Sequence, residues 1–184
     1  MSSTRVIAGR NQAVGANTLF YWQAAEINTS TLTVSNRGTQ VFTTVANTDV
    51  LTNDMNMDNF DSTNLLSTAG GKKVLSMSLS GTTITLGGVV TQDVLEVCCL
   101  TSSKAVLFYP KSYSGVYYLA ARAVTRSGTT LSLQTEYRLT TVLTVYRMDG
   151  GELGMNRLDT YKKSNTVVGV AFISKLDDKV YYLE

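Results

Sequence analysis

Residues 73–86 read KVLSMSLSGTTITL. The apolar side chains of Leu75, Met77 and Leu79 alternate with serines, and this period of two is typical of a strand with one buried and one exposed face. Gly81 interrupts the alternation, which then resumes at Ile84. A glycine between two alternating runs predicts a β-hairpin, because a tight turn needs a residue that adopts a positive φ.

The same turn chemistry recurs along the chain. The tetrapeptide Ser-Gly-Thr-Thr occupies residues 80–83 and again 127–130, NRGTQ occupies residues 36–40, and Asp177-Asp178 forms a fourth candidate turn. The glycines of the first three turns lie roughly 45 residues apart, which is compatible with an internal duplication or a propeller-like repeat. The simpler interpretation is that an all-β chain reuses one kind of turn.

Two further stretches indicate strands. In LSLQTEYRLTTVLTVYR, residues 131–147, apolar side chains occupy most odd positions. This run is longer than the usual strand of about five or six residues, so either a bulge interrupts it or the strand extends beyond the core to a neighbouring subunit. Near the end, NTVVGVAFIS is apolar at both odd and even positions, which favours a central strand covered on both faces.

From these patterns we predict an all-β fold, an antiparallel β-sandwich or flattened barrel of about ten strands. Residues 46–69 and 149–165 lack the period of two and are expected to form two long irregular loops, which are often functional in compact domains. We expect residues 1–17 to form an N-terminal arm and residues 18–184 to form a single β domain.

Composition excludes several functions. The chain has 184 residues, a net charge of +2 and no histidine. The low charge gives no basis for binding nucleic acid, and no apolar run approaches the roughly 20 residues of a membrane helix. The start has no segment of signal-peptide type, so we expect folding in a cytosol. Without histidine the commonest general base is missing, and we predict no enzyme activity and no cofactor. A pair of carboxylates involving Glu136 or Glu152 stays open as the exception.

The two cysteines are neighbours in VLEVCCL. Cys98 and Cys99 on one strand would point to opposite faces, and a disulfide between them would be strained. We therefore expect both to be reduced, buried and small apolar residues. No further thiols or histidines stand at metal-ligand spacing.

Residues 54–61, DMNMDNFD, raise the question of a calcium site. Asp54, Asn56 and Asp58 match the first three ligand positions of an EF-hand loop, and Asp61 follows. The glycine required at position six is Asn59, and the closing glutamate is Leu65. We therefore predict a contact or packing loop and keep metal binding as the weaker alternative, because Asn and Asp are common in loops that bond to their own backbone.

Aromatic residues occur in adjacent groups, such as residues 20–22, 108–109, 117–118 and 181–182. Neighbours on a strand face opposite sides, so we expect one of each pair in the core and the other free to contact a partner or a sugar. We expect partner contacts from the arm and the two irregular loops, at Arg5, Arg10, Met55, Met57, Phe60, Leu153, Met155 and Arg157.

In its β-rich pattern, low charge, abundance of Thr, Ser and Gly and lack of histidine, the chain resembles the small virion proteins of tailed bacteriophages. The resemblance implies a protein that forms homo-oligomers, binds a major capsid or tail protein, and is assembled into a virion in the host cytoplasm. A capsid decoration or cement protein is the first expectation, and a tail-tube or neck component is the alternative. A carbohydrate- or receptor-binding β-sandwich module is the second class.

Overall fold

The computed structural model describes residues 3–47, 50, 55–114, 116–140, 158–173 and 179–184. All regular structure in these residues is β-strand, which confirms the predicted all-β class. The strands are β1 (Ser3–Val14), β2 (Asn17–Asn28), β3 (Thr33–Arg37), β4 (Val41–Ala46), β5 (Met57–Asn59), β6 (Asn64–Ala69), β7 (Lys73–Ser80), β8 (Thr83–Thr91), β9 (Glu96–Thr101), β10 (Lys104–Tyr113), β11 (Val116–Ser127), β12 (Thr130–Arg138), β13 (Leu158–Lys162), β14 (Val168–Ile173) and β15 (Val180–Leu183). The described part of the chain contains no helix long and apolar enough to span a membrane.

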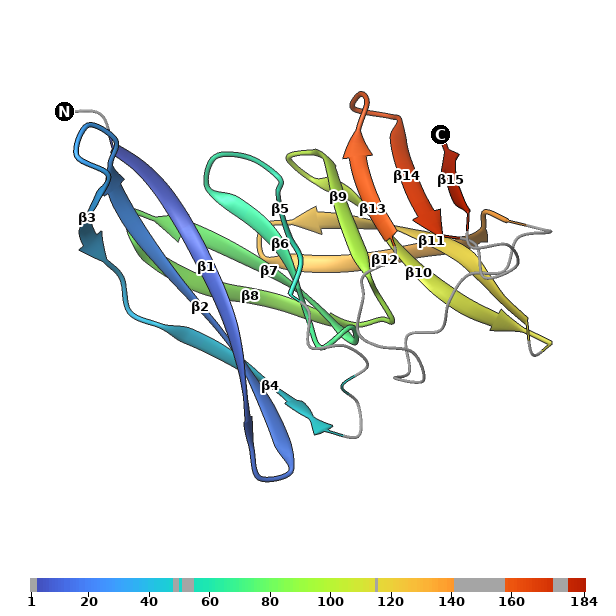
Figure 1. Ribbon diagram of the computed structural model, residues 1–184, viewed down its shortest axis with the longest axis horizontal. Helices are drawn as coiled ribbons and strands as arrows, with labels where there is room; N and C mark the ends of the chain where they lie inside the picture. The colour runs from blue at the N-terminus through green and yellow to red at the C-terminus, as the bar shows by residue number, and fades with distance from the viewer. Residues whose placement is uncertain (1–2, 48–49, 51–54, 115, 141–157, 174–178) are drawn as a thin grey trace.

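The strands form four small antiparallel sheets, each made of strands that are consecutive in the chain. The first sheet contains β1–β4, the second β5–β8, the third β9–β12 and the fourth β13–β15. The sheets follow one another like blades along the longest axis of the molecule, with the first and the fourth at opposite ends (Figure 1). The predicted sandwich or barrel of about ten strands is therefore wrong, because the chain forms more and smaller sheets.

Three hydrophobic cores join consecutive sheets. The first core contains Phe20 and Trp22 of the first sheet and Leu75 of the second. The second core lies between the second and third sheets, and the third core between the third and fourth. In the two middle sheets, adjacent residues on a strand therefore enter different cores, as Val74 and Leu75 do.

This arrangement corrects the expectation for β7. Leu75, Met77 and Leu79 are buried in the first core as predicted. The serine between the first two is also buried: Ser76 is 1% exposed, because its side of the strand faces the third sheet. Its hydroxyl donates to the carbonyl oxygen of Thr129 over 2.6 Å.

The adjacent cysteines agree with the prediction that both are reduced and buried. Both are free and buried, and Cys98 lies in the third core while Cys99 lies in the second. Burial raises the pKa of the Cys98 thiol to about 11, and the nearby Asp58 carboxylate adds to this. Burial and Asp58 also raise the pKa of Cys99. A thiol that stays protonated is a poor nucleophile and metal ligand, so both cysteines act as small apolar residues.

The two Ser-Gly-Thr-Thr segments form the predicted hairpins, β7–β8 and β11–β12. Gly81 and Gly128 adopt φ of 58° and 59°. The segment at residues 36–40 differs, because β3 and β4 do not pair with each other and both pair with β2. Gly38 has no positive φ and is needed for another reason: a Cβ there would collide with the carbonyl oxygen of Thr82 in the next sheet.

The same contact recurs one sheet further along. Gly88 in β8 approaches the carbonyl oxygen of Thr129, and its backbone N–H donates to that oxygen over 2.6 Å. Thr82 and Thr129 occupy equivalent positions in the two Ser-Gly-Thr-Thr turns, so each of these turns docks on a glycine of the preceding sheet. The spacing of roughly 45 residues thus corresponds to one sheet of the series.

The expected arm and loops contain more strand than predicted. Residues 3–14 form β1, which pairs with β2 along its full length, so the boundary drawn at residue 17 falls inside a hairpin. Residues 46–69 contain β5 and β6, and β13 begins at Leu158 inside the second predicted loop. β5 has only three residues and β6 is buried at nearly every position, so neither shows the period of two on which the prediction relied.

The long alternating run at residues 131–147 begins as β12. The pairing with β11 shifts between Arg122 and Val124, which confirms the alternative that a bulge interrupts the run. After the bulge, Tyr137 and Leu139 are exposed although the unbroken alternation placed them inside. Residues 141–147 lie outside the described residues. The apolar run near the end forms β14, which is the central strand of its sheet, as predicted. The expected cover on both faces is not seen among the described residues, because Val170 and Phe172 lie in the third core while Ala171 on the other face is only half-buried.

Candidate functional site

The acidic segment at residues 54–61 serves to pack the second sheet. Asp54 lies outside the described residues. The Asn56 side chain donates to the carbonyl oxygen of Leu95, and Asp58 accepts the backbone N–H of Cys99 over 2.6 Å. Both side chains thus tie the second sheet to the third. Among the described residues no group of three or more acidic, cysteine or histidine side chains converges as a metal site would require.

Asp61 closes a turn between β5 and β6. Its Oδ1 accepts the backbone N–H groups of Thr63 and Asn64 over 2.8 and 2.9 Å, and also the Thr63 hydroxyl. The Asn64 amide donates to both carboxylate oxygens. Partial burial raises the pKa of Asp61, but these hydrogen bonds outweigh burial and the pKa is lowered overall. Its oxygens are therefore used locally, as in an Asx turn.

We expect Asp61→Ala to lower the free energy of unfolding by about 1 kcal/mol, because two turn N–H groups lose their acceptor. Asp61→Asn, which keeps one acceptor oxygen, should lose about half as much. Urea unfolding at pH 7 measures both. Because the pKa of Asp61 is lowered on folding, its contribution should be present at neutral pH and decline as the pH falls through that pKa. Equal stability of Asp61→Ala and wild type would contradict this role.

The apolar members of the segment pack within the chain. Phe60 is 6% exposed in the second core, with the Arg126 guanidinium over its ring. Met55 and Met57 are half-buried against the first core. Phe60 therefore offers no surface to a partner. Leu153, Met155 and Arg157, the remaining loop residues expected at an interface, lie outside the described residues, as does Glu152.

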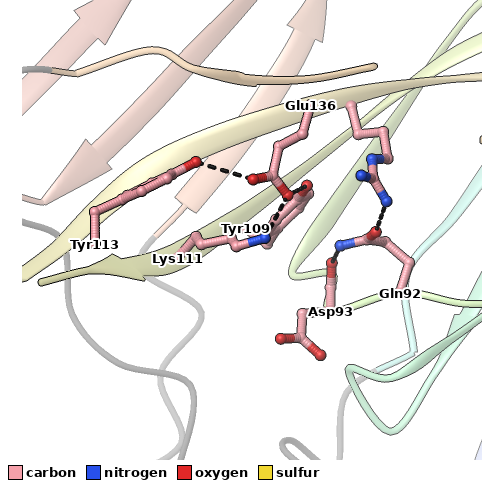
Figure 2. Close-up of polar contacts among 7 residues, drawn as sticks. Gln92, Asp93, Tyr109, Lys111, Tyr113 and Glu136 are labelled. Carbon is pink, nitrogen blue, oxygen red and sulfur yellow. Dashed lines mark hydrogen bonds and ion pairs between the residues drawn. The ribbon is translucent and has the colours of Figure 1, made fainter. Parts of the chain in front are cut away.

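The most concentrated polar cluster lies on β10 and β12 of the third sheet (Figure 2). Glu136 Oε2 accepts the Tyr109 hydroxyl over 2.6 Å and Lys111 Nζ over 2.9 Å. Its Oε1 accepts the Tyr113 hydroxyl over 2.9 Å. The three donors are spaced by two along β10 and so share one face. The bulge in β12 brings Glu136 to that same face.

The cluster continues through stacked side chains. The Arg138 guanidinium lies 5.3 Å from the ring centroid of Tyr113 and 4.8 Å from that of Tyr118. Nearby, the Arg122 guanidinium donates to the Gln92 side-chain oxygen over 2.7 Å. Arg122 thereby connects the third sheet to the segment that follows β8.

The protonation states in this cluster are well defined. Burial raises the pKa of Glu136, but the hydrogen bonds from Tyr109, Lys111 and Tyr113 outweigh it and the pKa is lowered. Burial, and then the bond to Glu136, raise the pKa of Tyr109. A carboxylate held ionised by three donors is suited to fixing strand geometry, and it lacks the raised pKa of a general acid. We therefore assign the cluster a structural role.

Sequence reasoning considered Glu136 only as half of a carboxylate pair. The spacing Tyr-x-Lys-x-Tyr at residues 109–113 does put three donors on one face of a strand. No local pattern reveals that an acceptor lies across an intervening strand, or that a bulge brings it to the correct face.

The adjacent aromatic residues follow their prediction in part. Phe20 and Trp22 are fully buried while Tyr21 faces outward, and Tyr182 is 71% exposed beside the half-buried Tyr181. Phe108 and Tyr109 differ, since both are buried, in the third and second cores respectively. A middle sheet has a neighbour on each face, so neither member of such a pair is free.

Two clefts open between neighbouring sheets. One, of about 530 Å³, lies between β1 and the second sheet and is lined by Arg5, Ile7, Asp61 and Leu79 among others. The other, of about 420 Å³, lies between the third and fourth sheets and is lined chiefly by apolar side chains such as Val106, Phe108 and Leu183. Each lining contains a single carboxylate, Asp61 in the first cleft and Glu184 in the second, and no cysteine.

Among the described residues, the longest strand at the edge of a sheet is β1. This strand is 12 residues long, pairs with β2 without a register shift, and forms the edge of the first sheet. Nearly all its side chains are exposed, including Arg5 and Arg10. A two-residue turn between Val14 and Asn17 joins β1 to β2, and Gly15 in this turn has a φ of 58°. In such a hairpin, N–H groups of odd-numbered β1 residues point away from β2.

Comparisons with known proteins add little. No family model matches the chain, and no curated protein matches it. A solved structure that matches it is an S. cerevisiae complex, Dbp5 bound to Nup159, Gle1, IP6 and ADP, with 10% sequence identity and a TM-score of 0.42. The match covers 95% of this chain and 48% of that chain, so the present chain spans about half of it. We draw no conclusion about fold or function from this likeness.

Proposed function

We propose that this protein is a non-enzymatic structural protein that self-associates and binds a larger viral assembly. Within the virion class, a capsid decoration or cement protein is the first choice, and a tail-tube or neck component is the alternative. The observation that carries the proposal is the position of β1 at the edge of its sheet. A long, regular edge strand is a template for pairing with another chain, and soluble proteins normally shorten or interrupt such edges.

The other edge strands are irregular or shorter than β1. β3, β8, β9 and β12 each contain or face a register shift. β5 has only three residues, and β4, β13 and β15, which are regular, have 6, 5 and 4 residues. β1 has no proline and no shift over its entire length. Pairing at this edge would supply backbone hydrogen bonds, while alternate side chains such as Arg5 and Val6 would set the register.

The test removes outward N–H groups from β1. Arg5 and Ala13 occupy odd positions, so the double substitution Arg5→Pro with Ala13→Pro deletes two outward donors and leaves the bonds to β2 in place. Two lost bonds at about 1 kcal/mol each should weaken self-association at least about tenfold. Arg5→Ala, which keeps its N–H, is the matched control and should associate nearly as wild type.

Native mass measured by light scattering over a range of concentrations reads out the result. Wild type should form oligomers that the double proline variant forms only at higher concentration, while the two have the same circular dichroism. A wild-type protein that stays monomeric at every concentration would overturn the proposed self-association.

A further inference from the structure

Among the described residues, two sheet faces have no other sheet packed on them. Within these residues each middle sheet is packed on both faces, whereas the first and fourth sheets are packed on one face only. Their outer faces lie at opposite ends of the molecule (Figure 1). Both outer faces carry exposed aromatic side chains, as Phe42 at 54% and Tyr182 at 71% exposure show.

On the outer face of the first sheet, three side chains form a row across β1, β2 and β4. Arg10 pairs with Tyr21 in register, and Tyr21 pairs with Phe42. The Arg10 guanidinium lies 4.6 Å from the Tyr21 ring centroid, and the two rings are 5.6 Å apart. Arg37, opposite Ala25, is on the same face. Among the described residues, the register places no carboxylate on this face, so it is basic.

The outer face of the fourth sheet has the opposite character. The Tyr161 ring lies over Gly169, where a Cβ would collide with it, and its hydroxyl donates to Glu184 over 3.0 Å. Asp159, Ala171 and Tyr182 form a row across β13, β14 and β15. The lysine on this face, Lys163, is paired with Glu184. Two carboxylates and one paired lysine make the face acidic.

We propose that the outer face of the first sheet in one copy packs on the outer face of the fourth sheet in a second copy. This inference rests on the proposed self-association and adds a second contact surface to the edge of β1. Inside the chain, three consecutive pairs of sheets already pack in this face-to-face manner. The contact between copies would add one more such pair, with aromatic side chains from both faces at its centre.

Charge selects this pairing over the alternatives. The row Arg10–Tyr21–Phe42 carries a cation at one end, and the row Asp159–Ala171–Tyr182 carries an anion at one end. Two basic faces or two acidic faces would repel, while a basic face against an acidic one attracts. The two surfaces differ, so the contact is heterologous and builds either a closed ring or an open filament.

The experiment uses one blocking substitution on each face. Phe42→Glu places a carboxylate on the basic first outer face, and Tyr182→Ala removes the exposed ring from the fourth. Both side chains are exposed, so each variant should keep the wild-type circular dichroism. Tyr137→Glu is the matched control, because Tyr137 is 63% exposed on the third sheet and belongs to neither face. Each face variant should associate at least about tenfold more weakly than wild type by light scattering.

Mixing the two face variants gives the decisive measurement. Each retains the face that the other has lost. With the β1 edge blocked in both by Arg5→Pro and Ala13→Pro, an equimolar mixture should therefore form dimers of one copy of each and stop there. If the face variants associate as wild type does, or if the mixture forms nothing that the separate variants lack, head-to-tail packing is wrong while self-association through β1 stands. If wild type itself stays monomeric, both proposals fail.

Discussion

Glu136→Ala is expected to lower the free energy of unfolding by about 2 kcal/mol, because a half-buried acceptor shared by three donors is lost. Tyr109 is 1% exposed, so its hydroxyl cannot recover the lost bond from water without opening the second core. Lys111 and Tyr113 are nearer the surface and can be hydrated. The cost should therefore arise mainly at Tyr109 and should appear in urea unfolding at pH 7 with an unchanged m-value.

The same network predicts a pH dependence. The pKa of Glu136 is lowered on folding, so its contribution is fully present above the ordinary glutamate pKa of about 4.3. The contribution should decline as the pH falls below that value and through the lowered pKa in the folded state. Glu136→Gln should flatten this part of the stability profile, because the amide does not titrate.

Two variants test whether the loss of stability in Glu136→Ala arises at Tyr109 or at Tyr113. Tyr109→Phe removes the buried hydroxyl together with its need for a partner, so Glu136→Ala in a Tyr109→Phe background should cost clearly less than in wild type. Tyr113→Phe, which removes a donor nearer the surface, should have a small effect. If Glu136→Ala is as stable as wild type at neutral pH, the network contributes nothing to the fold.

Local sequence patterns predicted the strands and hairpins better than their assembly. The alternation around Leu75 and the glycine of each Ser-Gly-Thr-Thr turn indicate a strand and a turn through short-range physics alone. The number of sheets depends on which strands pair next, and a period of two does not encode this. Ser76 illustrates the limit: it was expected to be exposed, and it is buried because a third sheet covers its side of β7.

The candidate sites were predictable to different degrees. The mismatches at Asn59 and Leu65 argued against an EF-hand loop, and Asp61 bonds to nearby backbone groups as Asx side chains commonly do. Asp58 also accepts from the backbone of Cys99, which is 41 residues away in the third sheet and which local patterns do not indicate. The acceptor role of Glu136 depends on a bulge and on an intervening strand, which sequence spacing does not reveal. The outer faces of the first and fourth sheets could be identified only after the structure showed which side chains of β2 and β14 pack inward.

Gly88→Ala should lower the free energy of unfolding by about 3 kcal/mol, a large effect for a single methyl group. The register of β7 and β8 shifts at Gly87 and Gly88, which oppose Ser76 in a bulge. A Cβ on Gly88 would lie 2.6 Å from the Thr129 carbonyl oxygen and 3.2 Å from the Leu131 backbone nitrogen. These are backbone atoms, so the β11–β12 turn would have to move away from the second sheet.

That movement would also break the hydrogen bonds on Thr129. Its carbonyl oxygen accepts both the Gly88 N–H and the Ser76 hydroxyl, each over 2.6 Å. Because Ser76 is buried, separating the sheets leaves its hydroxyl without this acceptor. The close approach at Gly88 and the two bonds therefore act together to seat the third sheet on the second.

Gly81→Ala is the control for the general cost of replacing glycine. Gly81 has a φ of 58° and open space around it, so alanine there meets backbone strain of about 1 kcal/mol and no collision. Chemical denaturation of the two variants side by side separates the effects. A Gly88→Ala variant no less stable than Gly81→Ala would show that the second and third sheets can move apart at little cost. The repeated docking of a threonine turn on a glycine would then not be what spaces consecutive sheets.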